Sequence, residues 1–235
     1  SRHAARTLAS LGTLEPALRD RVVSCLARSI REGADSERRE SVEALHQITD
    51  PDQRLDGEFA RLSRDPDASV RNVALESLAV RGKLTEQNER DIIRWAEEGD
   101  VRIIELLPKL ISDESVRTKS IVDALRSDSD DVRGAALSAA ESMGTGAPDA
   151  VVRGVLDAAR HPLPATVAMG QGIAGIGIRS GFDGSRARAV RVAGAIAAGR
   201  PEFVPDFLAL LGRRPEWDHE LNMRTSVRDA IAKLD

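Results

Sequence analysis

Cysteine and aromatic residues are scarce in this sequence. Its 235 residues include a single cysteine, Cys25, no Tyr at all, and only 3% aromatic residues in total. One cysteine excludes an intramolecular disulfide and any metal site that needs several Cys ligands. Because such low cysteine usage fits a reducing compartment, we predict a cytoplasmic protein.

Long apolar runs and a strong excess of one charge are also missing. The longest uncharged stretch, 162–178, is shorter than the roughly 18–20 apolar residues of a membrane span and contains two Pro and four Gly. We expect neither a signal peptide nor membrane contact. The 34 basic and 38 acidic residues give a net charge of −4, which argues against a general nucleic-acid coat.

An internal repeat is the dominant positive signal, in a chain whose 41% hydrophobic content is enough for a folded core. The segments 62–82 and 125–144 share Leu-x-x-Asp, then Val-Arg-x-x-Ala-Leu, and end at a Gly. A weaker copy occupies 99–111. The arginines of the three copies, Arg71, Arg102 and Arg133, are 31 residues apart. Because the chain begins at Ser1 within what resembles the second helix of a unit, we expect it to be excised from a longer protein.

Each repeat contains two helical patterns. Apolar residues at i, i+4 and i+8 predict first helices around 18–30, 55–62, 121–125 and 151–156. Second helices are predicted at 37–48, 68–80, 101–110, 131–143 and about 165–176, several with Asp or Ser before them as N-caps and some with Gly after them. No segment alternates apolar and polar residues in the manner of a strand.

The repeated Asp-x-Asp-x-x-Val-Arg-x-x-Ala pattern resembles the short bacterial and archaeal units of the HEAT repeat family. The resemblance covers most of 1–235, and the repeat register becomes unclear at 160–215. It implies an all-α, right-handed α-α superhelix (a HEAT-like solenoid) of about six to seven helix pairs in a single domain, with the second helices on its concave face. The physical argument agrees, because one helix pair cannot bury both of its faces and neighbouring pairs must stack.

The resemblance also implies a structural ladder in which the repeated arginine pairs with an Asp of the same or the adjacent unit. Arginine suits this role because its guanidinium binds a carboxylate through two hydrogen bonds. The alternative is a phosphate-binding stripe, which we consider the weaker interpretation. The ladder is predicted to contain Asp65, Arg71, Arg102, Asp128 and Arg133.

Two sets of residues are predicted to bind a partner. On the helix at 68–80, Ala74 and Leu78 belong to the buried stripe, which leaves Asn72 and Glu76 pointing away from it. The stretch 179–200 carries five Arg against one Asp. Its arginines could bind an acidic partner or a nucleic-acid backbone, or could pair with acids elsewhere in the fold. The candidates from this stretch are Arg179, Arg186, Arg188 and Arg191.

No catalytic constellation is recognisable. The sequence 170–175 matches G-x-G-x-x-G, but neither a preceding strand nor an acid about 20 residues later accompanies it. We therefore interpret it as part of a Gly- and Ala-rich helix, followed by a loop at 178–185. The four His lack metal-ligand spacing, and Cys25 lies in an apolar stripe that predicts a core position. We expect neither a cofactor nor enzymatic activity.

Three functions follow as hypotheses. The leading one is a non-enzymatic scaffold that binds another protein through a curved surface. The second is a nucleic-acid-binding protein, because HEAT-like DNA-repair glycosylases share the architecture, although the net charge and the few aromatics disfavour it. The third is a regulatory domain of a larger enzyme.

Overall fold

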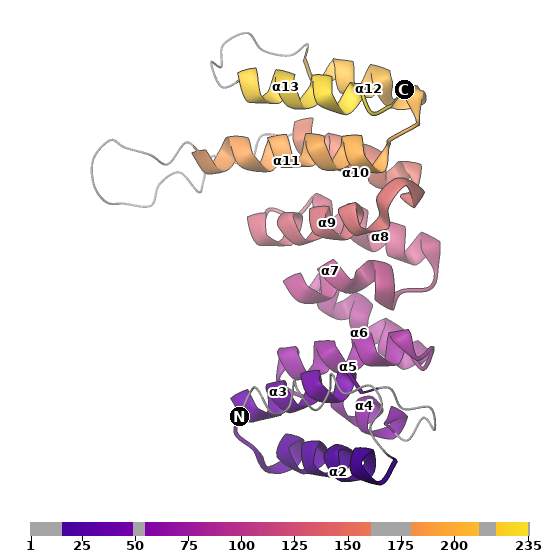
Figure 1. The fold of residues 1–235 in the computed structure, drawn as a ribbon. Helices are drawn as coiled ribbons and strands as arrows, with labels where there is room; N and C mark the ends of the chain where they lie inside the picture. The colour runs from indigo at the N-terminus through magenta and orange to yellow at the C-terminus, as the bar shows by residue number, and fades with distance from the viewer. Residues whose placement is uncertain (1–15, 49–54, 161–179, 212–219, 235) are drawn as a thin grey trace, which may run out of the picture. The chain divides into compact units, whose positions relative to one another are not determined.

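A computed structural model describes residues 16–48, 55–160, 180–211 and 220–234, and all the regular structure in these ranges is helical (Figure 1). This confirms the predicted all-α class. No helix in the same ranges is long and apolar enough to cross a membrane.

The chain divides into two compact units, unit 1 (Ser1–Asp91) and unit 2 (Ile92–Asp235), and α6 contributes to both. In chain order the helices are α2 (Pro16–Glu32), α3 (Asp35–His46), α4 (Asp56–Leu62), α5 (Ala68–Val80), α6 (Glu86–Glu97), α7 (Val101–Leu110), α8 (Glu114–Leu125), α9 (Asp130–Met143), α10 (Asp149–Arg160), α11 (Ser180–Ile196), α12 (Val204–Ala209) and α13 (Glu220–Ile231). Two 3₁₀ turns, η1 (Gly144–Gly146) and η3 (Pro201–Phe203), lie between them.

Unit 1 is built from helices that pack on their sequence neighbours and on the second neighbour. Helix α2 packs on α3, α3 packs on α5, and α4 packs on α5. Phe59 and Leu62 of α4, Leu45 of α3 and Leu78 of α5 are fully buried in the shared core. Helix α5 is therefore covered from two sides, by α3 and by α4.

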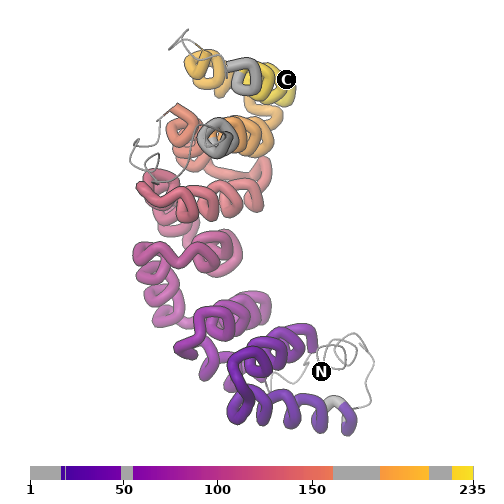
Figure 2. Tube along the Cα trace, turned by 90° about the vertical axis from the view of Figure 1, so that its left-hand side faces the viewer, coloured from indigo at the N-terminus to yellow at the C-terminus, as the bar shows by residue number. Residues whose placement is uncertain are grey.

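Unit 2 has the same alternation on a larger scale. Helices α7, α9, α11 and α13 pack side by side in that order, and α8 packs on α10. Figure 1 shows α7, α9, α11 and α13 stacked one above another, and Figure 2 shows the resulting two layers in side view. The pairs α8–α9, α10–α11 and α12–α13 connect the layers. We call the layer of α7, α9, α11 and α13 the inner layer of unit 2.

Small residues allow the helices of unit 2 to approach closely. On α9, Ala136, Ala139 and Ala140 are fully buried. A methyl group on Gly154 of α10 would lie 3.3 Å from Leu125 and Val122 of α8. The few aromatic residues are thus matched by thin helices whose backbones come close together, as the high Ala content suggests.

The helix ends follow the predicted chemistry. Asp67, Asp100, Asp113 and Ser129 are N-caps whose side-chain oxygens accept a hydrogen bond from a first-turn N–H group. Gly82 and Gly144 follow α5 and α9 with φ of 64° and 59°, which glycine adopts without steric cost.

Four predicted helix ranges agree closely with the structure, one predicted loop is partly wrong, and one helix was not predicted. The ranges 68–80 and 101–110 are confirmed to the residue, and those at 37–48 and 131–143 shift by one or two residues. The loop predicted at 178–185 is wrong from Ser180 onward, because α11 begins there despite its Gly content. Helix α6 was not predicted, because most of its residues are polar or charged and its apolar stripe is short. The predicted helix at 165–176 lies outside the described residues.

The contact between Gly194 of α11 and Ala230 of α13 gives a test of this close packing. A methyl group on Gly194 would lie 2.6 Å from Cβ and 2.8 Å from Cα of Ala230, so the two backbones must separate. We expect Gly194→Ala to lower the free energy of unfolding of unit 2 by about 1–3 kcal/mol, measured by denaturant titration.

The matched control is Gly134→Ala on α9 of the same unit, where the added methyl group would meet only the Arg188 guanidinium at 3.9 Å. Helix propensity alone should make this variant neutral or more stable by up to about 1 kcal/mol. Equal effects of the two substitutions would contradict the packing described here.

Candidate functional site

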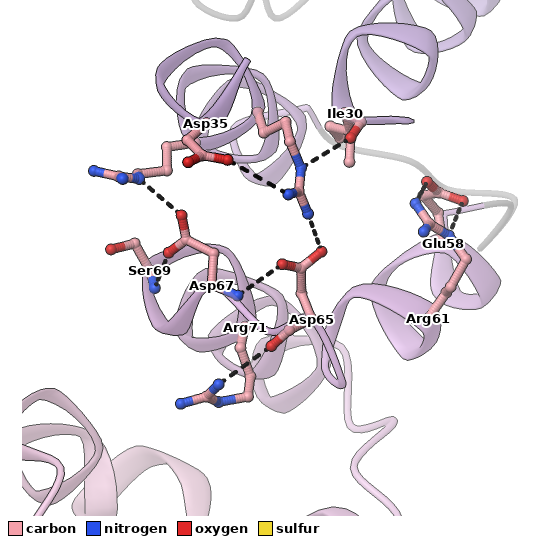
Figure 3. Close-up of polar contacts among 10 residues, drawn as sticks. Ile30, Asp35, Glu58, Arg61, Asp65, Asp67, Ser69 and Arg71 are labelled. Carbon is pink, nitrogen blue, oxygen red and sulfur yellow. Dashed lines mark hydrogen bonds and ion pairs between the residues drawn. The ribbon is translucent and has the colours of Figure 1, made fainter. Parts of the chain in front are cut away.

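The loop between α4 and α5 carries two aspartates that bind two consecutive arginines of α3 (Figure 3). Arg38 pairs with Asp65, and Arg39 Nε donates to Asp67 Oδ2 at 3.0 Å. Asp65 is nearly buried, with 8% of the residue exposed, and its Oδ1 accepts the Asp67 N–H at 2.9 Å. Ion pairs thus join α3 to the loop that precedes α5. The carboxylate of Asp65 thus pairs with Arg38, whereas the ladder was predicted to pair an Asp with a repeated arginine such as Arg71.

Asp67 performs two tasks at once. Its Oδ1 accepts the N–H of Ser69 at 2.8 Å and caps α5, while its other oxygen binds Arg39. Desolvation raises the pKa of Asp67, but the hydrogen bonds from Ser69 and Arg39 outweigh it and lower the pKa below its usual value. In the neighbouring helix α4, a hydrogen bond to Glu58 raises the pKa of Arg61.

The repeated arginine binds a backbone carbonyl. Arg71 Nη1 donates to the carbonyl oxygen of Asp65 at 3.2 Å, and Arg133 Nη1 donates to that of Ser127, six residues earlier in each case. Each arginine stands four residues after the N-cap of its helix, so its side chain reaches back over the preceding loop. We call this arrangement the arginine clamp. Arg133 also pairs with Asp130 of its own helix.

A third clamp escaped sequence analysis. Arg117 of α8 donates to the carbonyl oxygen of Ile111, again six residues earlier, at 2.8 Å. Its sequence, Asp113-Glu-Ser-Val-Arg117, matches the Asp-x-x-Val-Arg spacing around Arg71. This spacing opens a first helix of the repeat, whereas the predicted arginines all belong to second helices.

Arg102 and Asp128 do not occupy equivalent positions. Arg102 stands only two residues after the N-cap Asp100, so it is one half-turn out of register with Arg71 and binds Glu105 of its own helix at 3.0 Å. Asp128 is exposed and forms no ion pair with any described residue. Arginines that are regularly spaced by 31 residues therefore do not all make the same contacts.

The predicted exposure of Asn72 is wrong. Asn72 is buried, with 4% of the residue exposed, and Glu76 is half-buried. Helix α5 contacts both α3 and α4, so more of its circumference is covered than the single apolar stripe suggested. Asn72 therefore cannot contact a partner in this conformation.

The arginines of α11 mostly turn toward the protein. Arg186 Nε donates to the carbonyl of Ala159 at 2.9 Å. Arg188 donates to Ser138 Oγ at 2.8 Å and lies 4.0 Å from Glu141, both on α9. Arg191 remains exposed and forms no ion pair among the described residues, while Arg179 lies outside them. Three of the four predicted arginines can thus be placed, and two of those three hold α11 against its neighbours.

Among the described residues, His46, Ser77 and Cys25 carry groups whose chemistry could suggest catalysis. His46 Nδ1 lies 2.7 Å from Ser77 Oγ, but Ser77 is 2% exposed and its hydroxyl donates to the Val73 carbonyl. A hydroxyl so placed cannot reach a substrate. Cys25 is exposed, so its predicted core position is wrong. No cluster of potential metal ligands occurs in the described ranges, and the G-x-G-x-x-G segment lies outside them.

Comparison with known proteins yields no relative: no family model matches the chain, and neither a curated protein nor a solved structure is significantly similar to it. The fold and the contacts above therefore carry the functional argument alone.

The two adjacent arginines of α3 provide a stability test. Arg38→Ala leaves the nearly buried Asp65 carboxylate without its cation, so we expect a loss of about 2–4 kcal/mol in the free energy of unfolding. Arg39 is half exposed, and Arg39→Ala should cost at most about 1 kcal/mol. Thermal or denaturant unfolding of the two variants decides between this order and its reverse.

The lowered pKa of Asp67 gives a pH test. A carboxyl group with a lowered folded-state pKa stabilises the fold above its unfolded pKa of about 3.9 and loses this effect as pH falls through its folded pKa. Asn retains the cap but lacks the charge. The difference in unfolding free energy between the native protein and Asp67→Asn should be constant above about pH 5 and shrink below about pH 4.

The same difference should decrease with added salt, because Arg39 is exposed to solvent. A difference that grows on acidification would show that the Asp67 charge does not stabilise the fold.

Proposed function

We propose that this chain is a HEAT-like, right-handed α-solenoid that serves as a non-enzymatic scaffold for another protein. The inner layer of unit 2 is the observation that carries the proposal. Its four helices pack side by side, so their uncovered faces form one continuous surface. The repeated Asp-x-x-Val-Arg spacing and the arginine clamps support a common repeat unit.

The covered sides of these helices are filled with small and branched apolar residues. Helix α11, for example, buries Val190, Ala193 and Ile196, while Arg191 remains exposed on its free side. A surface of this kind recognises a partner by its shape and charge. Such recognition does not need a buried active site. Arg191 and the exposed Glu141 of α9 are the side chains we assign to partner contact.

Nucleic-acid binding is the weaker alternative. Arg186 and Arg188, which would contribute to a phosphate-binding face, donate instead to Ala159 and Ser138. The protein partner therefore remains our proposal, with a cytoplasmic location as its expected setting.

A photo-crosslinking amino acid placed at position 191 tests the proposal against one placed at Lys119, an exposed residue of α8 in the other layer. We expect position 191 to crosslink one defined protein and position 119 to crosslink none. The affinity of that protein, once purified, should fall at least about tenfold for Arg191→Glu and remain unchanged for Lys119→Glu.

Two results would contradict the scaffold. One is a partner affinity that neither substitution changes. The other is binding of duplex DNA that weakens steeply with salt and is lost in Arg191→Glu, which would support the nucleic-acid alternative.

A further inference from the structure

An open cavity in unit 2 has chemistry that the proposed scaffold surface does not use. It measures about 420 Å³, and the described residues that line it are Leu211, just beyond α12, and Arg224, Thr225 and Arg228 of α13. All four lining residues are exposed to solvent. The cavity therefore combines an apolar side chain from the end of α12 with a cationic wall from α13.

The cationic wall follows from the way α13 packs. Val227 and Ala230 are buried, and Ala230 meets Gly194 of α11, so that face of α13 is occupied. Arg224 and Arg228 stand one helical turn apart on a face that remains exposed. Arg228 pairs with its neighbour Asp229 at 3.1 Å, but both side chains are largely exposed, and such a pair costs little to exchange.

The apolar side of the cavity lies at the C-terminal end of α12. Phe207 of α12 is fully buried and holds that helix in place, while Leu208 and Leu211 are 51% and 37% exposed. The acid of α12, Asp206, is bound by Arg160 at 3.0 Å. The exposed Leu211 thus lies beside two exposed arginines, Leu208 is exposed three residues earlier in the chain, and the acid of α12 is already paired with Arg160.

We propose that this cavity, which we call the α12–α13 groove, binds an acidic amphipathic helix of a partner protein. Two carboxylates four residues apart on such a helix match the spacing of Arg224 and Arg228, and Thr225 adds a hydroxyl donor. Apolar side chains beside those carboxylates would cover Leu208 and Leu211.

Other occupants fit less well. A second copy of this chain docked by the same groove would bring the arginines of both copies together, which is repulsive. A nucleic-acid backbone would satisfy the arginines but would leave the leucines exposed to water. The acidic helix is the occupant that uses both walls.

The test uses the full chain and a labelled helical peptide of roughly fifteen residues, the length at which isolated helices become marginally stable. The peptide carries two Glu four positions apart and two Leu three positions apart on the adjoining face. Fluorescence anisotropy should show saturable binding that weakens at least about tenfold when Arg224→Glu and Arg228→Glu are combined. Lys119→Glu, with the same charge change on α8, should bind as the native protein does.

Three outcomes would overturn the proposal: no binding of the peptide at millimolar concentration, equal binding by the charge-reversed protein, or equal binding of a peptide in which Ser replaces both Leu. Competition by duplex DNA together with the last result would identify the groove as a phosphate-binding surface. Leu208→Ser with Leu211→Ser provides an independent variant, since both side chains are exposed and their loss should spare the fold. The groove is separate from Arg191, so failure here leaves the scaffold proposal standing.

Discussion

Within each unit, packing of a helix on its neighbours in the adjacent pair is the interaction on which the rest of the structure depends. No helix of unit 2 in the inner layer is covered by its own hairpin partner alone; α9 needs α7 and α11 as well as α8, and α11 needs α9 and α13 as well as α10. Burial of this kind is possible without large aromatic side chains because Gly and Ala let the backbones approach. This packing determines which helix faces are buried and which stay exposed. It therefore sets the positions of the exposed arginines and leucines, and with them every candidate binding surface.

Arginine, which outnumbers lysine 30 to 4, makes contacts that lysine could not replace. Arg38 bonds the carbonyl of Ile30 and the carboxylate of Asp65 with one guanidinium, and Arg200 likewise joins the carbonyl of Ala147 to the carboxylate of Asp149. A planar group with five donors can hold two acceptors in fixed directions, whereas an ammonium group is less directional. The arginine content therefore reflects architecture more than affinity for anions.

The sequence was sufficient to predict the helical class and two helices to the residue, because Asp caps, apolar spacing and terminal Gly all agree at 68–80. The sequence did not predict burial correctly where it depends on how many neighbouring helices pack against a helix. Asn72 and Cys25 were placed by a single stripe, yet α5 is covered on two sides and Asn72 is buried, while Cys25 is exposed. Arg71 and Arg102 are separated by the regular 31 residues, but Arg71 stands four residues after its N-cap and Arg102 only two. This half-turn difference is seen only when each arginine is counted from its N-cap. The α12–α13 groove was not foreseen at all, since it arises from side chains of two helices that no sequence motif connects.

The arginine clamp is closed within six residues, so each of the three turns that carry it has a stabilising contact encoded in its own sequence. A gene encoding such turns can gain or lose a whole unit by duplication or deletion, because the new junction contains its own arginine–carbonyl hydrogen bond. Length can then change across generations while every surviving turn keeps the same geometry.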